Sequence, residues 1–261
     1  MSTSFQSAVR RMALLRAQLP TVPEALARLL VLLVAALFLN TFVLQPYLIP
    51  SESMEHTLLV GDFVLVNKQI YAPCGSLGRW FLPYRDISRG NIVVFHHMQH
   101  PFLVKRVVGV PGDRLRISGG RVTVNGILLE EPYAAFEPAE SNPLRDDFPA
   151  QVYTDPNVDP DWWKQMQSLT RDGELAVPPG EYFVLGDNRN YSKDSRFWGF
   201  VSRQQIVARP LVIYFSLTRP STTDVDQAPP EASNDKLGHD RPLSARVEDF
   251  ARWKRIFHVV R

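Results

Sequence analysis

The chain changes character at Ile49-Pro50-Ser51-Glu52-Ser53-Met54, the stretch that joins a long apolar segment to a region rich in strand patterns. A serine in such a polar turn most often hydrogen-bonds the local backbone. Ser53 is still a candidate nucleophile because it stands at this junction. The residues on either side of the stretch must support or weaken that hypothesis.

The apolar segment before this stretch is long enough to cross a membrane. No residue from Leu29 to Ser51 carries a charge, and about 20 helical residues span the roughly 30 Å of hydrocarbon in a bilayer. We therefore predict one transmembrane helix over residues 25–47, ended by Pro46 and Pro50 because proline cannot continue a helix. A cleavable signal or a buried core helix is the alternative, but the run is longer than a usual signal core and lacks an A-x-A exit.

Basic residues near the start of the helix set its expected orientation. Arg10, Arg11, Arg16 and Arg28 are opposed by Glu24 alone. Because basic flanks stay in the cytoplasm, residues 1–24 are expected to be cytoplasmic and the bulk of the protein to lie outside the cytoplasm. An organellar transit peptide stays open as an alternative, since residues 1–16 contain arginine and no acidic residue.

Composition limits the partners and the chemistry that we expect. The formal net charge is +2 and the basic residues form no stripe, so nucleic acid is not expected as a partner. Cys74 is the only cysteine, which excludes an internal disulfide. His96, His97 and His100 have no carboxylate or cysteine at ligand spacing, so a solvated turn explains them and we expect no metal or other cofactor.

Residues 48–219 carry the patterns of antiparallel strands. Asn125-Gly126 between two alternating runs is a strong hairpin signal. We predict a mainly β domain over residues 48–219, with an insertion at about 114–176 that includes a short helix near 161–166. The strand-like runs are 63–66, 91–95, 102–108, 115–117, 121–124, 127–130, 182–185, 206–207 and 211–215.

The C-terminal residues 220–261 differ from this domain in composition. Residues 220–242 are polar and rich in proline, serine and aspartate, which predicts a flexible tail. Residues 250–261 are basic and aromatic. They suit either a helix that lies in the lipid headgroups or a segment that docks on the protein, and both interpretations stay open.

Lys105 lies in the run 102–108, where alternation puts it on the same face as Leu103 and Val107. Such a lysine most often keeps its amine in water or protects a sheet edge. If Lys105 is buried instead, desolvation lowers its pKa and leaves a neutral amine that can accept a proton. The polar loop 186–199 is a second site candidate, with a surface turn held by Asp–Arg pairs as its alternative.

Several stretches together resemble, in order, the signature boxes of bacterial type I signal peptidases. The resemblance covers roughly residues 49–215 and follows one membrane anchor. Glu52, His56 and Asn91 depart from the family pattern, which more often has glycine, proline and aspartate there. The matching stretches are Ser51-x-Ser53-Met54 with Thr57-Leu58 and Gly61-Asp62, Arg89 to Phe95, Val104 to Asp113, and Gly186 to Gly199.

This resemblance implies an antiparallel β catalytic domain with a Ser/Lys dyad, in which Ser53 is the nucleophile and Lys105 the general base. Ser51 matches the side-chain donor to the oxyanion, and Ser192 matches the hydroxyl that holds the lysine. Family members accept small side chains at Ala-x-Ala sites. The remaining matched or nearby residues are Asp194 and Arg196 as a supporting ion pair, and Ile49, Met54 and Val104 as the nearest apolar candidates for the substrate pockets.

We therefore expect a membrane-bound serine endopeptidase that removes signal peptides from exported preproteins through an acyl-enzyme. We also expect a monomer, anchored in the lipid bilayer of the bacterial plasma (inner) membrane. Self-cleaving SOS-type repressors share the dyad, but they need a DNA-binding module. The alternative from another class is a catalytically silent, membrane-tethered β-domain that acts as a binding module.

Overall fold

The computed structural model describes residues 22–71, 85–97, 100–153, 155–218 and 250–260. It divides the chain into two compact units, residues 1–43 and 44–261. In the first unit, helix α2 (Val22–Phe38) continues into a π-helical turn, Leu39–Val43. Among the described residues, Val22–Thr41 is the one helical span that is long and apolar enough to cross a membrane, with a mean hydropathy of 2.2.

The helical segment ends at Val43, before residue 47, where the predicted anchor ends. Residues Leu44–Leu48 form strand β1, which pairs antiparallel with β2 (Asp62–Asn67). Pro46 lies within β1, an edge strand, which is the position in a sheet where proline is tolerated. The two prolines therefore do not end the helix, because the chain has already joined the edge of a sheet.

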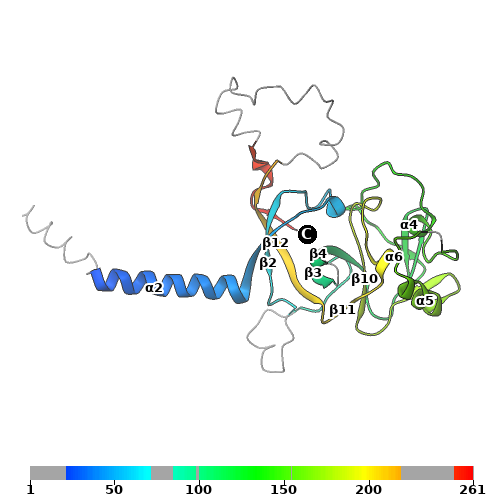
Figure 1. The fold of residues 1–261 in the computed structure, drawn as a ribbon, viewed down its shortest axis with the longest axis horizontal. Coiled ribbons are helices and arrows are strands. Elements are labelled where there is room, and N and C mark those ends of the chain that lie inside the picture. The colour runs from blue at the N-terminus through cyan, green and yellow to red at the C-terminus, as the bar shows by residue number, and fades with distance from the viewer. Residues whose placement is uncertain (1–21, 72–84, 98–99, 154, 219–249, 261) are drawn as a thin grey trace, which may run out of the picture. The chain divides into compact units, whose positions relative to one another are not determined.

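The described residues of the second unit form an eight-stranded sheet in the order β1-β2-β12-β3-β4-β10-β11, with β13 also paired to β12 (Figure 1). All of its pairs are antiparallel, which confirms the predicted mainly β, antiparallel fold. The other strands of this sheet are β3 (Ile92–His97), β4 (His100–Gly109), β10 (Glu181–Leu185), β11 (Val201–Ser202), β12 (Ile206–Ser216) and β13 (His258–Val259).

The insertion carries a second sheet and shares a hydrophobic core with strands β4 and β10 of the main sheet. In the hairpin between β6 and β7, Asn125 and Gly126 have φ angles of 53° and 78°, the positive values that a two-residue type I′ turn requires. Trp162 and Met166 are buried together with Phe183 of the main sheet. The second sheet has the order β7-β6-β5-β9-β8, with β5 (Arg114–Ser118), β6 (Arg121–Val124), β7 (Ile127–Leu128), β8 (Thr170–Arg171) and β9 (Glu174–Ala176).

Short helices accompany this second sheet. They are α4 (Pro143–Asp146), α5 (Pro160–Leu169), which covers the predicted short helix, and α6 (Ser195–Trp198), and Figure 1 shows them on the same side of β10. Helix α5 contacts α6 directly, because the Trp162 indole donates to the carbonyl of Arg196 at 3.2 Å. The insertion therefore packs against the end of the loop that contains the candidate site residues.

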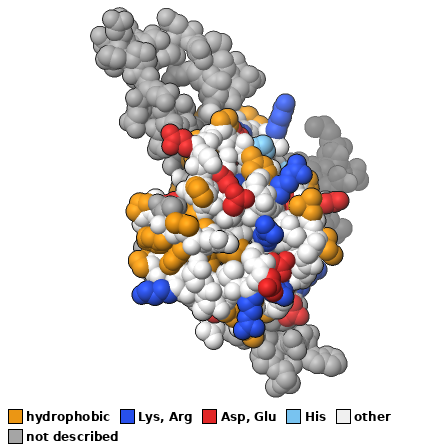
Figure 2. All heavy atoms as spheres, turned by 90° about the vertical axis from the view of Figure 1, so that its right-hand side faces the viewer, with side chains coloured by type: hydrophobic (Ala, Val, Ile, Leu, Met, Phe, Trp, Pro, Cys, Tyr) orange, Lys and Arg blue, Asp and Glu red, His pale blue; other side chains and the backbone are white. Residues whose placement is uncertain are grey.

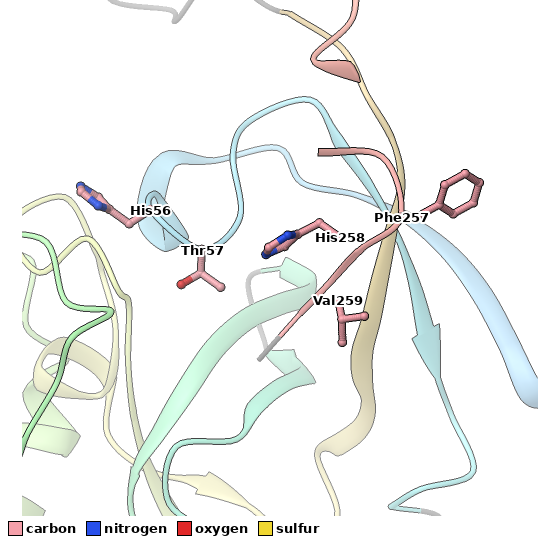
Figure 3. A pocket seen from close by; sticks show the side chains of 5 residues that line it. All are labelled: His56, Thr57, Phe257, His258 and Val259. Carbon is pink, nitrogen blue, oxygen red and sulfur yellow. The ribbon is translucent and has the colours of Figure 1, made fainter. Parts of the chain in front are cut away.

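The C-terminal segment 250–260 packs against the eight-stranded sheet of the second unit, of which it is a part. Strand β13 pairs with β12, and Val260 is 4% exposed in a cluster with Ile49 and Met54. Figure 3 shows His258 directed toward Thr57 and Phe257 directed away from it. Of the two interpretations left open by the sequence, the structure has the docked segment. The predicted flexible tail 220–242 lies outside the described residues, as does Cys74.

Charged side chains of both signs are interspersed over the face of the molecule shown in Figure 2. Basic side chains do not gather into a stripe on that face, within the residues that the structure describes. Its electrostatic character is therefore mixed, as the near-neutral composition implies.

Candidate active site

Ser53 lies on a short 3-10 helix, η2 (Glu52–Met54), and is 9% exposed. Its hydroxyl oxygen is 3.4 Å from that of Ser51. The turn is closed at its base, where Ile49 N donates to the Asp62 carbonyl at 2.9 Å and Gly61 N donates to the Ile49 carbonyl at 3.0 Å. Met54 is buried beneath the turn. Backbone pairing and packing therefore both fix the position of Ser53.

Lys105 lies in β4, an internal strand between β3 and β10, and is 2% exposed. The edge-strand alternative therefore does not hold. Burial lowers the pKa of the Lys105 amine to about 8; the Asp194 and Asp187 carboxylates oppose this shift, whereas the Arg196 guanidinium adds to it. Near neutral pH a usable fraction of the amine is therefore unprotonated and can accept a proton.

The loop after β10 lies directly against the turn of Ser53. Asn188 N donates to the Ser53 carbonyl at 3.2 Å. A Cβ at Gly186 would overlap with both the Ser192 hydroxyl and the Ser53 carbonyl, so only glycine allows this approach. Within the described part of the chain, the buried Ser192 hydroxyl has no hydrogen-bond partner. It is thus a polar group available to a partner in the site.

Two buried ion pairs hold this loop and strand β4. Arg196 and Asp194 are joined at 2.8 Å, and Arg106 and Asp187 at 2.7 Å, with side chains that are at most 3% exposed. Burial alone would raise the pKa of Asp194, but the Arg196 guanidinium and its hydrogen bonds hold that pKa below its ordinary value. Asp187 also accepts a 2.6 Å hydrogen bond from the Thr57 hydroxyl, which links the loop to the segment after Ser53.

Ser53 and Lys105 line one cleft of about 430 Å³. Ile49, Met54 and Val104 are instead buried in one hydrophobic cluster and are not among the residues that line this cleft. Val104 faces away because alternation along β4 puts it opposite Lys105. Their role as pocket residues stays a prediction. The remaining lining residues are Tyr47, Pro50, Ser51, His97, Phe102, Leu103, Tyr191, Lys193 and Trp198.

Two of the departures from the family pattern have a local structural role. Asn91 accepts hydrogen bonds from the Tyr71 hydroxyl at 3.0 Å and from Ser88 N at 3.1 Å, which an aspartate would also do. His56 has a φ of 79°, which proline cannot adopt because its ring fixes φ near about −65°. The backbone just after the turn of Ser53 therefore differs from one that contains proline.

The described residues contain no group of three or more His, Cys, Asp or Glu side chains that could hold a metal ion. The ring of His96 lies 4.6 Å from that of Phe102, and the ring of His97 lies 4.8 Å from that of Trp198. Aromatic packing therefore accounts for these two histidines.

Sequence reasoning missed several residues that connect the site. Arg106 and Asp187 stand inside the recognised boxes, but nothing in the sequence indicated that they pair. Glu131 and Tyr133 carried no signal at all, although Glu131 contacts the fully buried Arg189 and Tyr133 covers Arg106. The structure does bring the predicted residues close together. The cleft is lined by Ser51, Ser53 and Lys105, and the adjoining loop carries Ser192.

Comparison with known proteins gives one family. The profile of the family "Signal peptidase, peptidase S26" matches residues 22–215. The chain is 32% identical over 248 residues to "Signal peptidase I" of Aquifex aeolicus, covering 79% of this chain and 89% of that one. It is 37% identical over 195 residues to "Signal peptidase I" of Leptolyngbya laminosa (71% and 76% covered) and 34% identical over 188 residues to "Signal peptidase IB" of Staphylococcus aureus strain COL (71% and 85% covered).

Proposed function

Because this chain belongs to the peptidase S26 family of signal peptidases, we propose that Ser53 is its catalytic nucleophile and Lys105 its general base. The chain is a membrane-bound serine peptidase, a hydrolase that cleaves signal peptides from preproteins. One observation carries the residue assignment: Ser53 and the buried Lys105, whose pKa is lowered to about 8, line the same cleft.

In the proposed acylation step, the neutral Lys105 amine takes the proton of the Ser53 hydroxyl as that oxygen attacks the scissile carbonyl. A serine hydroxyl is a weak nucleophile at neutral pH and needs such a base. The protonated amine then gives the proton to the leaving amine of the mature protein. The product of this step is an ester between Ser53 and the signal peptide.

The oxyanion that forms during attack needs donors that are already in place. The Ser51 hydroxyl, which is 3.4 Å from the Ser53 hydroxyl, and the Ser53 backbone N–H are the proposed donors. One such donor contributes about 3 kcal/mol in comparable sites. Small substrate side chains, as in Ala-x-Ala, suit a cleft between the Ser53 turn and strand β4.

For deacylation, we propose that Lys105 removes a proton from a water molecule, which attacks the ester. The protonated amine then returns this proton to the Ser53 oxygen as the signal peptide leaves. The free Ser192 hydroxyl is the proposed partner that orients the Lys105 amine. Asp194 and Arg196 take no part in the chemistry and hold the loop that carries Ser192.

We further propose that residues 1–24 are cytoplasmic and that the second unit acts outside the cytoplasm, in the inner membrane of a bacterium. The arginines before the apolar helix support this orientation. We also propose that the protein is a monomer. Ser53 is expected to work near the lipid surface, because residues 44–52 are all that separate the first unit from it along the chain.

The assignment is tested with the full chain in detergent or vesicles and a preprotein whose leader ends in Ala-x-Ala. Ser53→Ala and Lys105→Met are each expected to abolish cleavage, whereas Lys254→Met, an exposed lysine in the C-terminal segment, keeps it. In the parent, kcat/KM is expected to rise with pH and level off above about 8, as the amine loses its proton. Cleavage by either dyad variant at the parent rate refutes the dyad.

A further inference from the structure

The insertion contains the segment Glu131-Pro132-Tyr133-Ala134-Ala135, which contacts the loop after β10. This segment packs on Arg106, the residue after Lys105, and it pairs with Asp187 and Arg189, which flank the loop residue that donates a hydrogen bond to Ser53. We propose that this segment, called the strap below, positions Ser53 and Lys105 for catalysis, with Glu131 and Tyr133 as its positioning residues. The proposal rests on the dyad assignment above and adds to it a role for the insertion.

The strap binds the loop through a buried ion pair. Glu131 accepts two hydrogen bonds from the Arg189 guanidinium, at 2.8 and 2.5 Å, and the two side chains are 7% and 2% exposed. Arg189 in turn donates from Nε to the Gly186 carbonyl at 3.1 Å. Gly186 is the residue that lies against both the Ser53 carbonyl and the Ser192 hydroxyl. Glu131 therefore acts on the site through Arg189 and Gly186.

The strap also pairs with the loop through its backbone. Ala135 N donates to the Asp187 carbonyl at 2.7 Å, and Arg189 N donates to the Ala135 carbonyl at 2.8 Å. Asn188, between these two loop residues, donates to the Ser53 carbonyl. The strap thus fixes the loop at the two residues that flank its direct contact with Ser53.

Tyr133 connects the strap to the strand of the proposed base. Its ring lies 3.9 Å from the guanidinium carbon of Arg106, the residue after Lys105, and its hydroxyl donates to Glu131 at 3.2 Å. Arg106 also donates two hydrogen bonds to the Asp187 carboxylate, at 2.8 and 2.7 Å. A cation against an aromatic face in a desolvated site is a favourable contact, so Tyr133 limits the movement of β4 at Lys105.

The buried charges around the strap show that Glu131 is needed to compensate the charge of Arg189. Arg106, Arg189 and Arg196 are all buried. Asp187 pairs with Arg106 and Asp194 with Arg196, so Glu131 supplies the carboxylate for Arg189. Without it, the loop would carry a buried guanidinium whose ion-pair partner is lost, and the loop would shift to hydrate that charge.

The test compares variants of the full chain in kcat and KM for a preprotein, at a temperature far below unfolding. Glu131→Gln and Tyr133→Leu are expected to lower kcat about 10- to 100-fold with KM nearly unchanged, the size expected for a misplaced catalytic group. Tyr133→Phe keeps the ring over Arg106 and is expected to retain most of the activity. Glu130→Gln, the exposed neighbour, is the matched control and keeps parent values.

A purely structural role is separated by Met166→Ala, which removes a buried side chain from the hydrophobic cluster between the insertion and β10 and leaves the strap unchanged. This variant is expected to unfold at a lower temperature and still to keep the parent kcat when folded. The proposal is overturned if Glu131→Gln and Tyr133→Leu keep the parent kcat, or if Met166→Ala loses kcat as they do. Ser53→Ala in the same assay reports separately on the dyad, because its cleavage would refute the assignment on which the strap depends.

Discussion

The turn of Ser53 and the loop after β10 meet at one site, yet different interactions hold them. The turn lies on an apolar cluster that includes Ile49 and Met54, and its base is closed by backbone hydrogen bonds. The loop, by contrast, is held by three buried ion pairs, Asp194–Arg196, Asp187–Arg106 and Glu131–Arg189.

This difference implies two kinds of response to mutation. Loss of a methyl group in the apolar cluster leaves a small cavity, so the loss of unfolding free energy is small and increases with the volume removed. Loss of one partner from a buried ion pair leaves the other charge without compensation, so its cost is several times larger. The loop should therefore be the more fragile half of the site, and the following variants can break or sharpen that contrast.

The largest effect is expected for Arg196→Met, which leaves the Asp194 carboxylate buried at 0% exposure without its guanidinium partner. The free energy of unfolding is expected to fall by about 3–5 kcal/mol, measured by urea denaturation. Arg121→Met, an exposed arginine of β6, is the control. If both variants lose the same small amount of unfolding free energy, the buried ion pairs do not make the loop the more fragile half of the site.

The next effect, expected for Lys105→Met, has the opposite sign. The pKa of Lys105 is lower in the folded state (about 8) than its ordinary value of 10.5, so the unfolded chain binds more protons between these pH values and the parent becomes more stable as pH rises through them. The variant is expected to be more stable than the parent by about 3 kcal/mol below pH 8. That gain should shrink toward pH 10, and a gain independent of pH would refute its electrostatic origin.

A smaller effect is expected for Ile49→Val in the apolar cluster, where Ile49 is 3% exposed. Removal of one methylene should lower the free energy of unfolding by about 1 kcal/mol. Urea denaturation at the pH used for Arg196→Met gives the comparison directly. A loss as large as that of Arg196→Met would show that the turn is as fragile as the loop.

The smallest effect is expected for His56→Gly. A φ of 79° is unfavourable for a side chain with a Cβ, so glycine should raise the free energy of unfolding by roughly 1 kcal/mol or less. Glu55→Gly is the matched control in the same turn, because Glu55 has a φ of −53° and glycine there should destabilise. The same sign for both variants would argue against a left-handed backbone at His56.

Local patterns in the sequence predicted most of the fold. Alternation located the strands, and Asn125-Gly126 located its hairpin because both residues tolerate positive φ. Ser53 and Lys105 were found from their boxes rather than from local chemistry, since a turn serine and a strand lysine are common in themselves. The sequence left open whether Lys105 is a buried base or an exposed lysine of an edge strand. The sheet order removes the second alternative, because β4 lies between β3 and β10.

What the sequence did not predict depends on contacts between distant residues. Residues 44–48 are apolar enough to extend the anchor, and only the edge of β2 makes them a strand. Glu131 and Arg189 are 58 positions apart, so no periodicity links them. Strand β13 spans only His258–Val259, too short to show alternation, and it exists because β12 offers an edge beside Val212 and Ile213.

The close approach at Gly186 also bears on how such a site can change over generations. A single methyl group added there would act as a wedge between the Ser53 carbonyl and the Ser192 hydroxyl. A change at Ser192 could remove one of these two contacts, but no side-chain substitution removes the backbone carbonyl of Ser53. Position 186 is therefore fixed by the absence of a side chain, and an engineer who redesigns this loop should leave it untouched.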